Sequence, residues 1–96
     1  MIEKILGSPL RIRIILALWE MGEINATELA KRLETNYSQL ISHIKLLASY
    51  GLVEERRIGR IRLVKLRNSE LVKMLVNALK QADESIKRGK ADVTYE

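Results

Sequence analysis

Cysteine is absent from this chain of 96 residues, and histidine occurs only once, at position 43. Without cysteine the chain can form neither a disulfide nor a thiolate zinc site, and catalysis by a thiol is excluded as well. One histidine is too few for the multi-histidine sites that bind zinc within a single chain. Because no nucleophile–base pair and no glycine-rich phosphate loop are visible either, we expect no enzyme, no metal and no cofactor.

Long apolar runs are missing too, and the first residues do not have the pattern of a secretory signal peptide. These absences favour a cytoplasmic protein without a membrane span. Hydrophobic residues nevertheless make up 47% of the chain, which is enough for a folded core and too much for a disordered protein. A chain of this length fits a single compact unit.

The basic residues are concentrated in the middle of the chain. The formal net charge is +5, and residues 36–66, with six basic and two acidic side chains, hold +4 of it. A charged run is often only a solvated face. Here the excess coincides with a predicted hairpin, so it favours an acidic partner, most commonly nucleic acid for a small basic domain.

Hydrophobic spacing and turn residues predict a mainly helical chain with one small antiparallel β-hairpin, an α+β fold. The predicted helices cover residues 9–21, 26–34, 37–50 and 69–88, and the predicted strands cover residues 52–57 and 61–66. Ile24 could add a very short third strand, and residues 58–60 are expected to form the hairpin turn.

Polar residues and glycines mark the ends of these helices. The predicted N-caps are Ser8, Asn25, Asn36 and either Asn68 or Ser69. Gly51 and Gly89 are predicted to end the third and the fourth helix. A helix–turn–helix followed by a basic two-stranded wing is the element order of a winged helix–turn–helix, here with a long C-terminal helix added.

Several segments resemble the ArsR-like transcription regulators. They are residues 8–15 (SPLRIRII) in the first helix, 28–33 (ELAKRL) in the second, 42–47 (SHIKLL) and 50–53 (YGLV) in the recognition helix and its exit, and 56–60 (RRIGR) in the wing. The resemblance spans residues 7–67 and implies a DNA-binding regulator of the compact, archaeal type. Metal sensing in that family uses cysteines or carboxylate–histidine clusters that this chain lacks, so that role does not carry over.

The third helix and the wing hold the predicted DNA contacts, because short polar side chains near a helix N-terminus can read the base edges of the major groove. The predicted contacts are Asn36, Tyr37, Ser38, Gln39, Ile41, Ser42, His43, Lys45, Arg56, Arg57, Arg60 and Arg62. Gln39 would pair with adenine and Ile41 would touch a thymine methyl. Asn36 and Ser38 would hold a phosphate, and the wing arginines would reach phosphates or a narrow minor groove.

Some of these side chains have a purely structural alternative. Tyr37 could pack on the helix turn, and Ile41 could pack on a neighbouring side chain. His43 is expected to be exposed or to contact phosphate rather than to pack or to bind a metal. Arg11 and Arg13 are expected to be solvated rather than bound to phosphate.

Apolar stripes on the first and the last helix predict a two-fold homodimer. The predicted interface residues are Ile12, Trp19, Val72, Leu75, Leu79, Ala82 and Ile86, of which those in the last helix recur at the spacing of a helix–helix seam. Leu71, Met74 and Ala78 form a second edge, which is expected to face the domain's own core. A dimer of this kind would place its two recognition helices roughly 34 Å apart, whereas in the alternative the seam packs within one chain.

The expected organisation is a DNA-binding domain over residues 1–67, a dimerisation helix over residues 68–89 and a flexible tail over residues 90–96. The predicted function is a dimeric regulator that binds double-stranded DNA sequence-specifically and acts as a repressor. Two alternatives stay open, namely a weakly specific architectural DNA-binding protein and a winged-helix module for protein–protein contacts.

Overall fold

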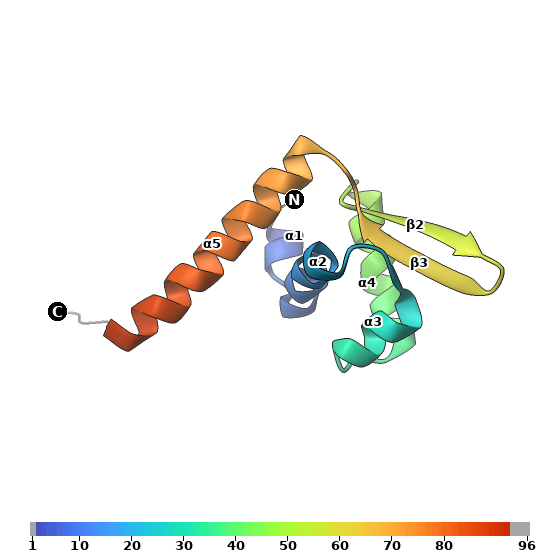
Figure 1. Cartoon of the computed structure of the whole chain (residues 1–96), viewed down its shortest axis with the longest axis horizontal. Helices are drawn as coiled ribbons and strands as arrows, with labels where there is room; N and C mark the ends of the chain where they lie inside the picture. The colour runs from blue at the N-terminus through green and yellow to red at the C-terminus, as the bar shows by residue number, and fades with distance from the viewer. Residues whose placement is uncertain (1, 93–96) are drawn as a thin grey trace.

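A computed structural model describes residues 2–92 of the chain, with side chains up to residue 89. Its elements are α1 (Ile2–Leu6), α2 (Pro9–Met21), β1 (Ile24–Asn25), α3 (Ala26–Arg32), α4 (Tyr37–Ser49), β2 (Val53–Ile58), β3 (Ile61–Leu66) and α5 (Glu70–Asp92). The helices α1 to α4 gather in the middle of the molecule, the β2–β3 hairpin projects on one side, and α5 runs out on the other (Figure 1). The predicted α+β fold is confirmed, and the molecule measures 57 × 28 × 23 Å.

Polar side chains cap the N-termini of α2, α3, α4 and α5 at the positions that the sequence predicted. The capping residues are Ser8, Asn25, Asn36 and Ser69, whose side-chain oxygens accept backbone N–H hydrogen bonds at 2.7 to 3.3 Å. Each cap satisfies an N–H group that has no partner inside its helix. The predicted ends of the second and third helices and of the strands lie within two residues of the observed ones.

The sheet has three antiparallel strands in the order β1–β3–β2. Ile24 pairs with Val64, so the short strand expected there is confirmed. Ile58 pairs with Ile61, which makes the hairpin turn two residues long rather than the predicted three. Gly59 opens that turn with a φ of 60°, a conformation that glycine adopts without strain.

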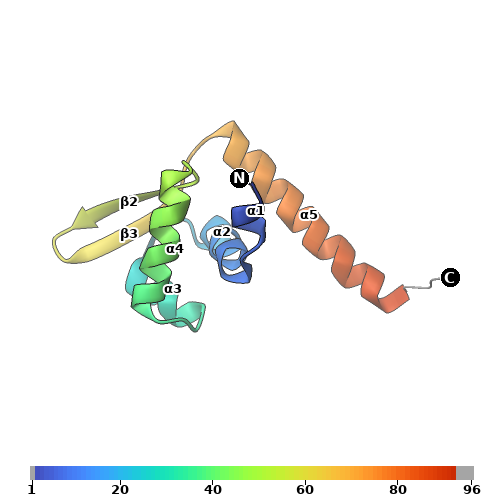
Figure 2. The same cartoon turned by 180° about the vertical axis from the view of Figure 1, so that it is seen from behind.

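One apolar core joins the helices to the sheet. The fully buried large side chains are Ile14, Ile15, Leu18, Leu29, Leu40, Ile44, Leu47, Val64 and Val76. In the part of the chain that the structure describes, no polar or charged side chain is buried with them. Seen from behind, α4 lies across the base of the hairpin (Figure 2), and the buried residues of α4 belong to the same core as Val53 of β2 and Val64 of β3.

The first helix, α1, was not predicted from the sequence. Its five residues are too few to show a helical period, although Ile5 is buried and anchors it to the core. The N–H of Gly7 donates to the carbonyl of Glu3 at 2.8 Å and closes the helix.

The first turns of α5 present other faces than those predicted. Val72 and Val76, one turn apart, are buried in the core, whereas Leu71 and Met74 are 66% and 67% exposed. Ala78 is exposed as well, so the expectation that Leu71, Met74 and Ala78 face the core is wrong, and Val72 lies inside the protomer rather than at an interface. A spacing of three and four residues identifies an apolar face of a helix but does not say what covers it.

The C-terminal end of α5 also differs from the prediction. The helix continues through Gly89 to Asp92, so Gly89 does not end it. The predicted flexible tail therefore begins, at residues 90–92, as helix, and its residues 93–96 lie outside the described part of the chain.

The turn between α3 and α4 contains a strained residue that can be tested. Glu34 has a φ of 56°, in the left-handed region, which costs a residue with a Cβ atom about 1–2 kcal/mol. Glu34→Gly should raise the free energy of unfolding by about 0.5–1 kcal/mol, because glycine removes this strain while adding entropy to the unfolded chain. Denaturant unfolding at a fixed protein concentration measures the change.

A matched control is Gln81→Gly, at an exposed position inside α5. There glycine relieves no strain, so the free energy of unfolding should fall by about 1 kcal/mol. If Glu34→Gly loses as much stability as the control, the turn is not strained at this position.

Candidate nucleic-acid interface

Helix α4 presents a polar face opposite an apolar one. Leu40, Ile44 and Leu47 are fully buried and fix the rotation of the helix about its axis. The exposed residues on the remaining surface include Tyr37, Ser38, Gln39, Ser42 and Lys45, all of them predicted contacts. Asn36 is exposed at the start of the same helix, and its Oδ1 accepts the N–H of Gln39 at 2.7 Å.

The N-terminal turn of α4 is held in place by residues that immediately precede it. The hydroxyl of Thr35 donates to Oε1 of Gln39 at 3.1 Å, so the predicted base-reading amide is oriented by a neighbour. Sequence reasoning missed Thr35, although its position four residues before Gln39 is the spacing at which such a contact can form. Tyr37 is 44% exposed, which favours the surface over packing on the turn.

Two predicted contacts on α4 are less accessible than expected. Ile41 is half-buried and packs against the core, so the structure favours its packing alternative over contact with a thymine methyl. His43 is also half-buried, and its Nδ1 accepts a hydrogen bond from Nε of Arg11 at 3.1 Å. Burial and, secondly, the nearby charge of Arg11 lower the pKa of the His43 imidazole below its ordinary value.

The two arginines of α2 that were expected to be solvated make hydrogen bonds within the protein, although the Arg13 side chain is also exposed. Arg11 hydrogen-bonds His43 and also donates from Nη1 to the carbonyl of Lys4 in α1. Nη2 of Arg13 donates to the carbonyl of Leu33 at 3.0 Å, at the C-terminal end of α3. Both side chains therefore connect helices that are distant in the sequence.

The wing separates its arginines into paired and unpaired ones. Nε and Nη2 of Arg56 donate to the two carboxylate oxygens of Glu23 at 2.8 and 2.9 Å, and this contact lowers the pKa of Glu23. Nη1 of Arg62 lies 3.2 Å from Oε1 of Glu55, with the Arg62 side chain only 16% exposed. Arg56 and Arg62 were predicted to contact DNA, but acidic neighbours already engage both of them.

The tip of the wing carries the remaining positive charge. Arg57, in β2, and Arg60, in the turn, are exposed, and neither has an ion-pair partner among residues 2–92. Ile58 and Ile61, beside them, are exposed as well. The outermost part of the hairpin is thus cationic with a small apolar surface, while its base is neutralised by Glu54 and other acidic residues.

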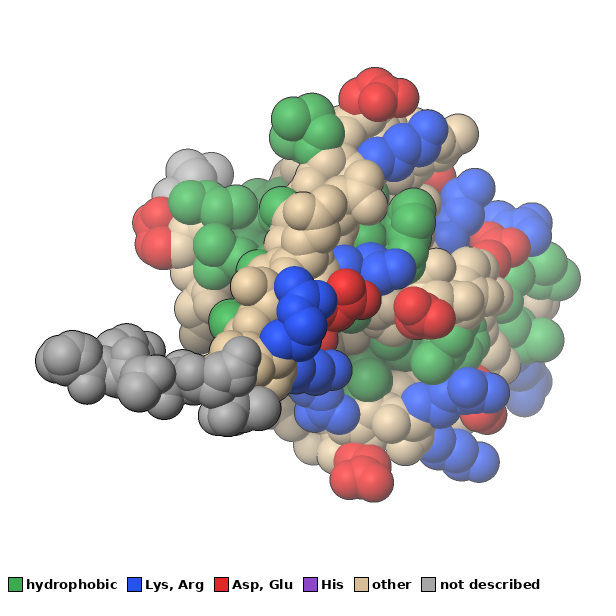
Figure 3. All heavy atoms as spheres, turned by 60° about the vertical axis from the view of Figure 1, so that its left-hand side comes forward, with side chains coloured by type: hydrophobic (Ala, Val, Ile, Leu, Met, Phe, Trp, Pro, Cys, Tyr) green, Lys and Arg blue, Asp and Glu red, His purple; other side chains and the backbone are tan. Residues whose placement is uncertain are grey.

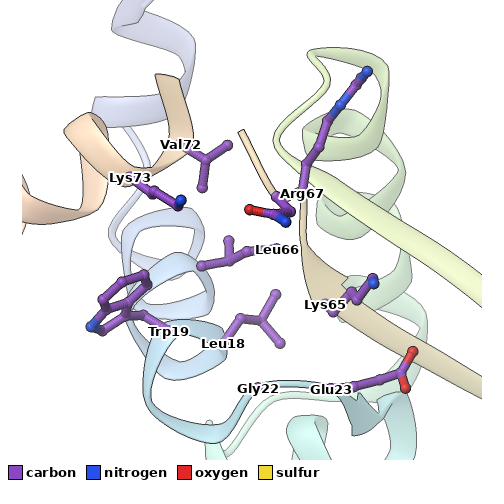
Figure 4. Close-up of a pocket in the computed structure, with 10 residues that line it drawn as sticks. Leu18, Trp19, Gly22, Glu23, Lys65, Leu66, Arg67, Val72 and Lys73 are labelled. Carbon is purple, nitrogen blue, oxygen red and sulfur yellow. The ribbon is translucent and has the colours of Figure 1, made fainter. Parts of the chain in front are cut away.

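A hollow of about 250 Å³ lies between α2, β3 and the start of α5. Leu18 and Leu66 line it between Trp19 on one side and Lys65 on the other (Figure 4). Nζ of Lys80 lies 5.8 Å from the centre of the Trp19 ring. Trp19 is exposed, so its predicted place in a dimer interface stays a prediction.

Two kinds of feature are absent from the described part of the chain. Within the described residues, no three acidic or histidine side chains come together as a possible metal site. None of the described helices combines the length and the apolar character that a membrane span requires.

Comparison with known proteins places this geometry in context. Residues 6–56, which include α2, α3, α4 and part of the wing, match a family model described as a helix-turn-helix domain. No curated protein matches the sequence.

Solved structures share the fold over most of the chain. HlyU from Vibrio cholerae is 28% identical, with a TM-score of 0.75 over 84% of this chain and 86% of its own. The transcriptional regulator HlyU from Vibrio vulnificus is 27% identical, with a TM-score of 0.71 over 84% of this chain and 82% of its own. FabT from Streptococcus pneumoniae, in a crystal structure with DNA, has the same fold at 14% identity, with a TM-score of 0.73 over 98% of this chain and 71% of its own.

Proposed function

The chain belongs to the helix-turn-helix domain family and is a winged helix–turn–helix, DNA-binding transcription regulator, and we propose that it binds a specific DNA site as a two-fold dimer and represses transcription there. In this proposal α4 enters the major groove and the wing tip reaches the adjacent backbone or minor groove. The observation that carries the proposal is the polar, exposed face of α4 on the side opposite its buried anchors.

The proposed base contacts lie in the first two turns of α4. The amide of Gln39 can accept from and donate to adenine in the major groove, and the Thr35 hydroxyl orients it for that pairing. Ser38, Ser42 and Lys45 are exposed beside it and can reach base edges or phosphates. The free N–H groups at the start of the helix add a place for a phosphate oxygen.

The proposed backbone contacts are fewer than the sequence predicted. Arg57 and Arg60 have no competing carboxylate in the described chain, so they are the wing residues available to phosphates. Arg56 and Arg62 would first have to give up Glu23 and Glu55. We therefore assign the electrostatic reach of the wing to its tip.

The proposed dimer surface uses α1 and the first turns of α5. Ile2, Leu6, Leu71 and Met74 are exposed apolar side chains, and Figure 3 shows apolar groups at the surface beside α5. A hollow of about 450 Å³, lined by Ile2, Ile5, Ser49, Tyr50, Leu52, Leu71 and Leu75, lies between these elements. Exposing such a surface costs about 25 cal/mol per Å², so covering it with a second copy is favourable.

This surface modifies the interface predicted from the sequence. Val72 is buried in its own protomer, Leu75 and Leu79 are partly buried against the same core, and Ala82 and Ile86 are exposed. The latter four, with Ile12 and Trp19, remain proposed interface residues. A bound dimer that covers a promoter excludes polymerase from it, and this occlusion is the repression that we propose.

The wing arginines can be tested through the salt dependence of DNA binding. Arg57→Ala and Arg60→Ala should each weaken binding to a selected site and to random DNA about equally. Each should also make the slope of log K against log salt shallower by about 0.9 per protomer, because one phosphate contact and its released counterion are lost. Fluorescence anisotropy at several salt concentrations measures both effects.

Arg56→Ala is the matched control for this experiment, because Glu23 already holds that guanidinium. Its slope should stay close to that of the unsubstituted protein. If all three variants bind DNA as the unsubstituted protein does, the wing is not part of the interface.

Sequence specificity depends on Gln39. After selection of the preferred DNA sequence, Gln39→Ala should weaken binding to that site by about 1–3 kcal/mol and leave binding to random DNA nearly unchanged. Competition binding with the two DNAs measures the difference. Equal losses on both would favour the architectural alternative over a sequence-specific regulator.

The dimer surface predicts a change of oligomeric state. Leu71→Asp together with Met74→Asp places two charges on the proposed contact and should shift a dimer to a monomer at micromolar concentration. The fold should survive, since both side chains are exposed. Light scattering measures the mass, circular dichroism checks the fold, and an unsubstituted protein that is already monomeric would refute the dimer.

A further inference from the structure

Arg11 connects three helices beside the proposed reading face. Its Nε donates to Nδ1 of His43 on α4 at 3.1 Å, and its Nη1 donates to the carbonyl of Lys4 in α1. The backbone N–H of Arg11, in the first turn of α2, donates to the capping hydroxyl of Ser8. Two nitrogens of the guanidinium, Nε and Nη1, are therefore engaged, and the contact fixes the edge of the imidazole that faces α2.

This contact determines where the imidazole carries its proton. A guanidinium has only donors and stays charged, so Nδ1 of His43 must accept with its lone pair. A neutral imidazole without a proton on Nδ1 carries its one proton on Nε2. Burial of the ring, followed by the charge of Arg11, lowers the pKa of His43 and keeps the ring neutral near pH 7, and Arg11 is the charged group of the described chain that acts on it.

The protonated nitrogen, Nε2, is available for a ligand. Within residues 2–92, no hydrogen bond engages it, and the half-buried ring leaves part of its surface accessible. The two ring nitrogens lie on different edges of the imidazole, so Nε2 is turned away from Arg11. His43 follows Gln39 by four residues, which places both side chains on the same side of α4, one turn apart.

We infer that Arg11 is a positioning residue for DNA binding, which holds His43 as the neutral Nε2–H tautomer so that His43 donates a hydrogen bond to a phosphate oxygen. The inference rests on the proposed function, because it takes α4 to be the helix that faces DNA. A neutral donor differs from lysine or arginine in one measurable respect. It strengthens binding without displacing a counterion, so it does not add to the salt dependence.

The tautomer can be observed without DNA, by long-range proton–nitrogen NMR of the imidazole. His43 is the chain's one histidine, so its signals need no assignment. At pH 7.5 the unsubstituted protein should show the Nε2–H form alone. Arg11→Met, which removes the donor and the charge, should give a mixture of tautomers and a higher pKa, and Arg11→Gln, which keeps a donor, should retain the Nε2–H form with a raised pKa.

Arg13→Gln is the matched control, because Arg13 contacts Leu33 and not the imidazole. It should leave both the tautomer and the pKa of His43 unchanged. An Nδ1–H form in the unsubstituted protein, or an unchanged spectrum in Arg11→Met, would overturn the role of Arg11. Thermal unfolding of each variant establishes that it is folded, and Arg11→Gln keeps the test open if Arg11→Met is not.

DNA binding tests the donor itself. His43→Ala should weaken binding to DNA about tenfold per protomer, the effect expected for one hydrogen bond to a charged acceptor, with no change in the salt slope. His43→Gln, whose amide nitrogen can replace Nε2–H, should recover most of the affinity. A slope that becomes shallower by about 0.9 per protomer in His43→Ala would mean a cationic contact, and unchanged affinity would mean no contact, so either result would overturn the inference.

The wing variants separate this outcome from a failure of the proposed function. If Arg57→Ala and Arg60→Ala weaken DNA binding while His43→Ala does not, the protein still binds DNA through its wing and the histidine contact is wrong. If the protein binds no DNA even at low salt, the proposed function fails, whereas the NMR result still decides whether Arg11 sets the tautomer.

Discussion

The burial of one face of α4 is the constraint on which the rest of the surface depends. Leu40, Ile44 and Leu47 are fully enclosed by the core, and each such side chain contributes about 1.5–3 kcal/mol relative to exposure. Because they recur at four and three residues, they fix which way the helix is rotated. Ser38, Gln39 and Ser42 face outward for that reason, and the cap at Asn36 and the hydroxyl of Thr35 then set the detail of the first turn.

The hairpin arranges charge by the same geometric logic. Glu55 pairs with Val64 in the ladder, two residues from Arg62 on the partner strand, and this diagonal brings the carboxylate and the guanidinium together. Glu23 lies just before β1, at one edge of the sheet, and accepts hydrogen bonds from Arg56 of β2, the strand at the other edge. The acidic residues near the base of the wing thus form ion pairs with the nearest arginines. The arginines at the tip, which is farthest from the core, remain unpaired among the described residues.

Local signals in the sequence were enough to predict most of the fold. A capping side chain at Asn36, a glycine with positive φ at the end of α4 and the turn between the two long strands each act within a few residues, and the structure has each of them. They do not depend on what packs against the element. The short helix α1 was not predicted, because five residues are too few to show a helical period.

Contacts between distant parts of the chain could not be predicted in the same way. The hydrogen bond from Arg11 to His43 spans 32 residues, and that from Arg56 to Glu23 spans 33. Arg56 and Arg62 have the charge that DNA binding requires, but no local pattern in the sequence predicts that acidic residues pair with them. The faces of α5 were misassigned for a related reason, since an apolar stripe is equally suited to its own core and to a partner.

Two of the unpredicted features, α1 and the contact made by Arg11, belong to one physical connection. The apolar residues of α1 lie on the surface that we assign to the second copy, and the carbonyl of Lys4 in the same helix accepts from Arg11. The other end of that guanidinium holds His43 on α4. At the opposite end of the chain, Val72 and Val76 make the first turns of α5 part of the same core. A dimer formed through α1 and α5 would therefore orient the two α4 helices through packed side chains and one guanidinium rather than through a linker, so the spacing of its DNA half-sites is set by the fold.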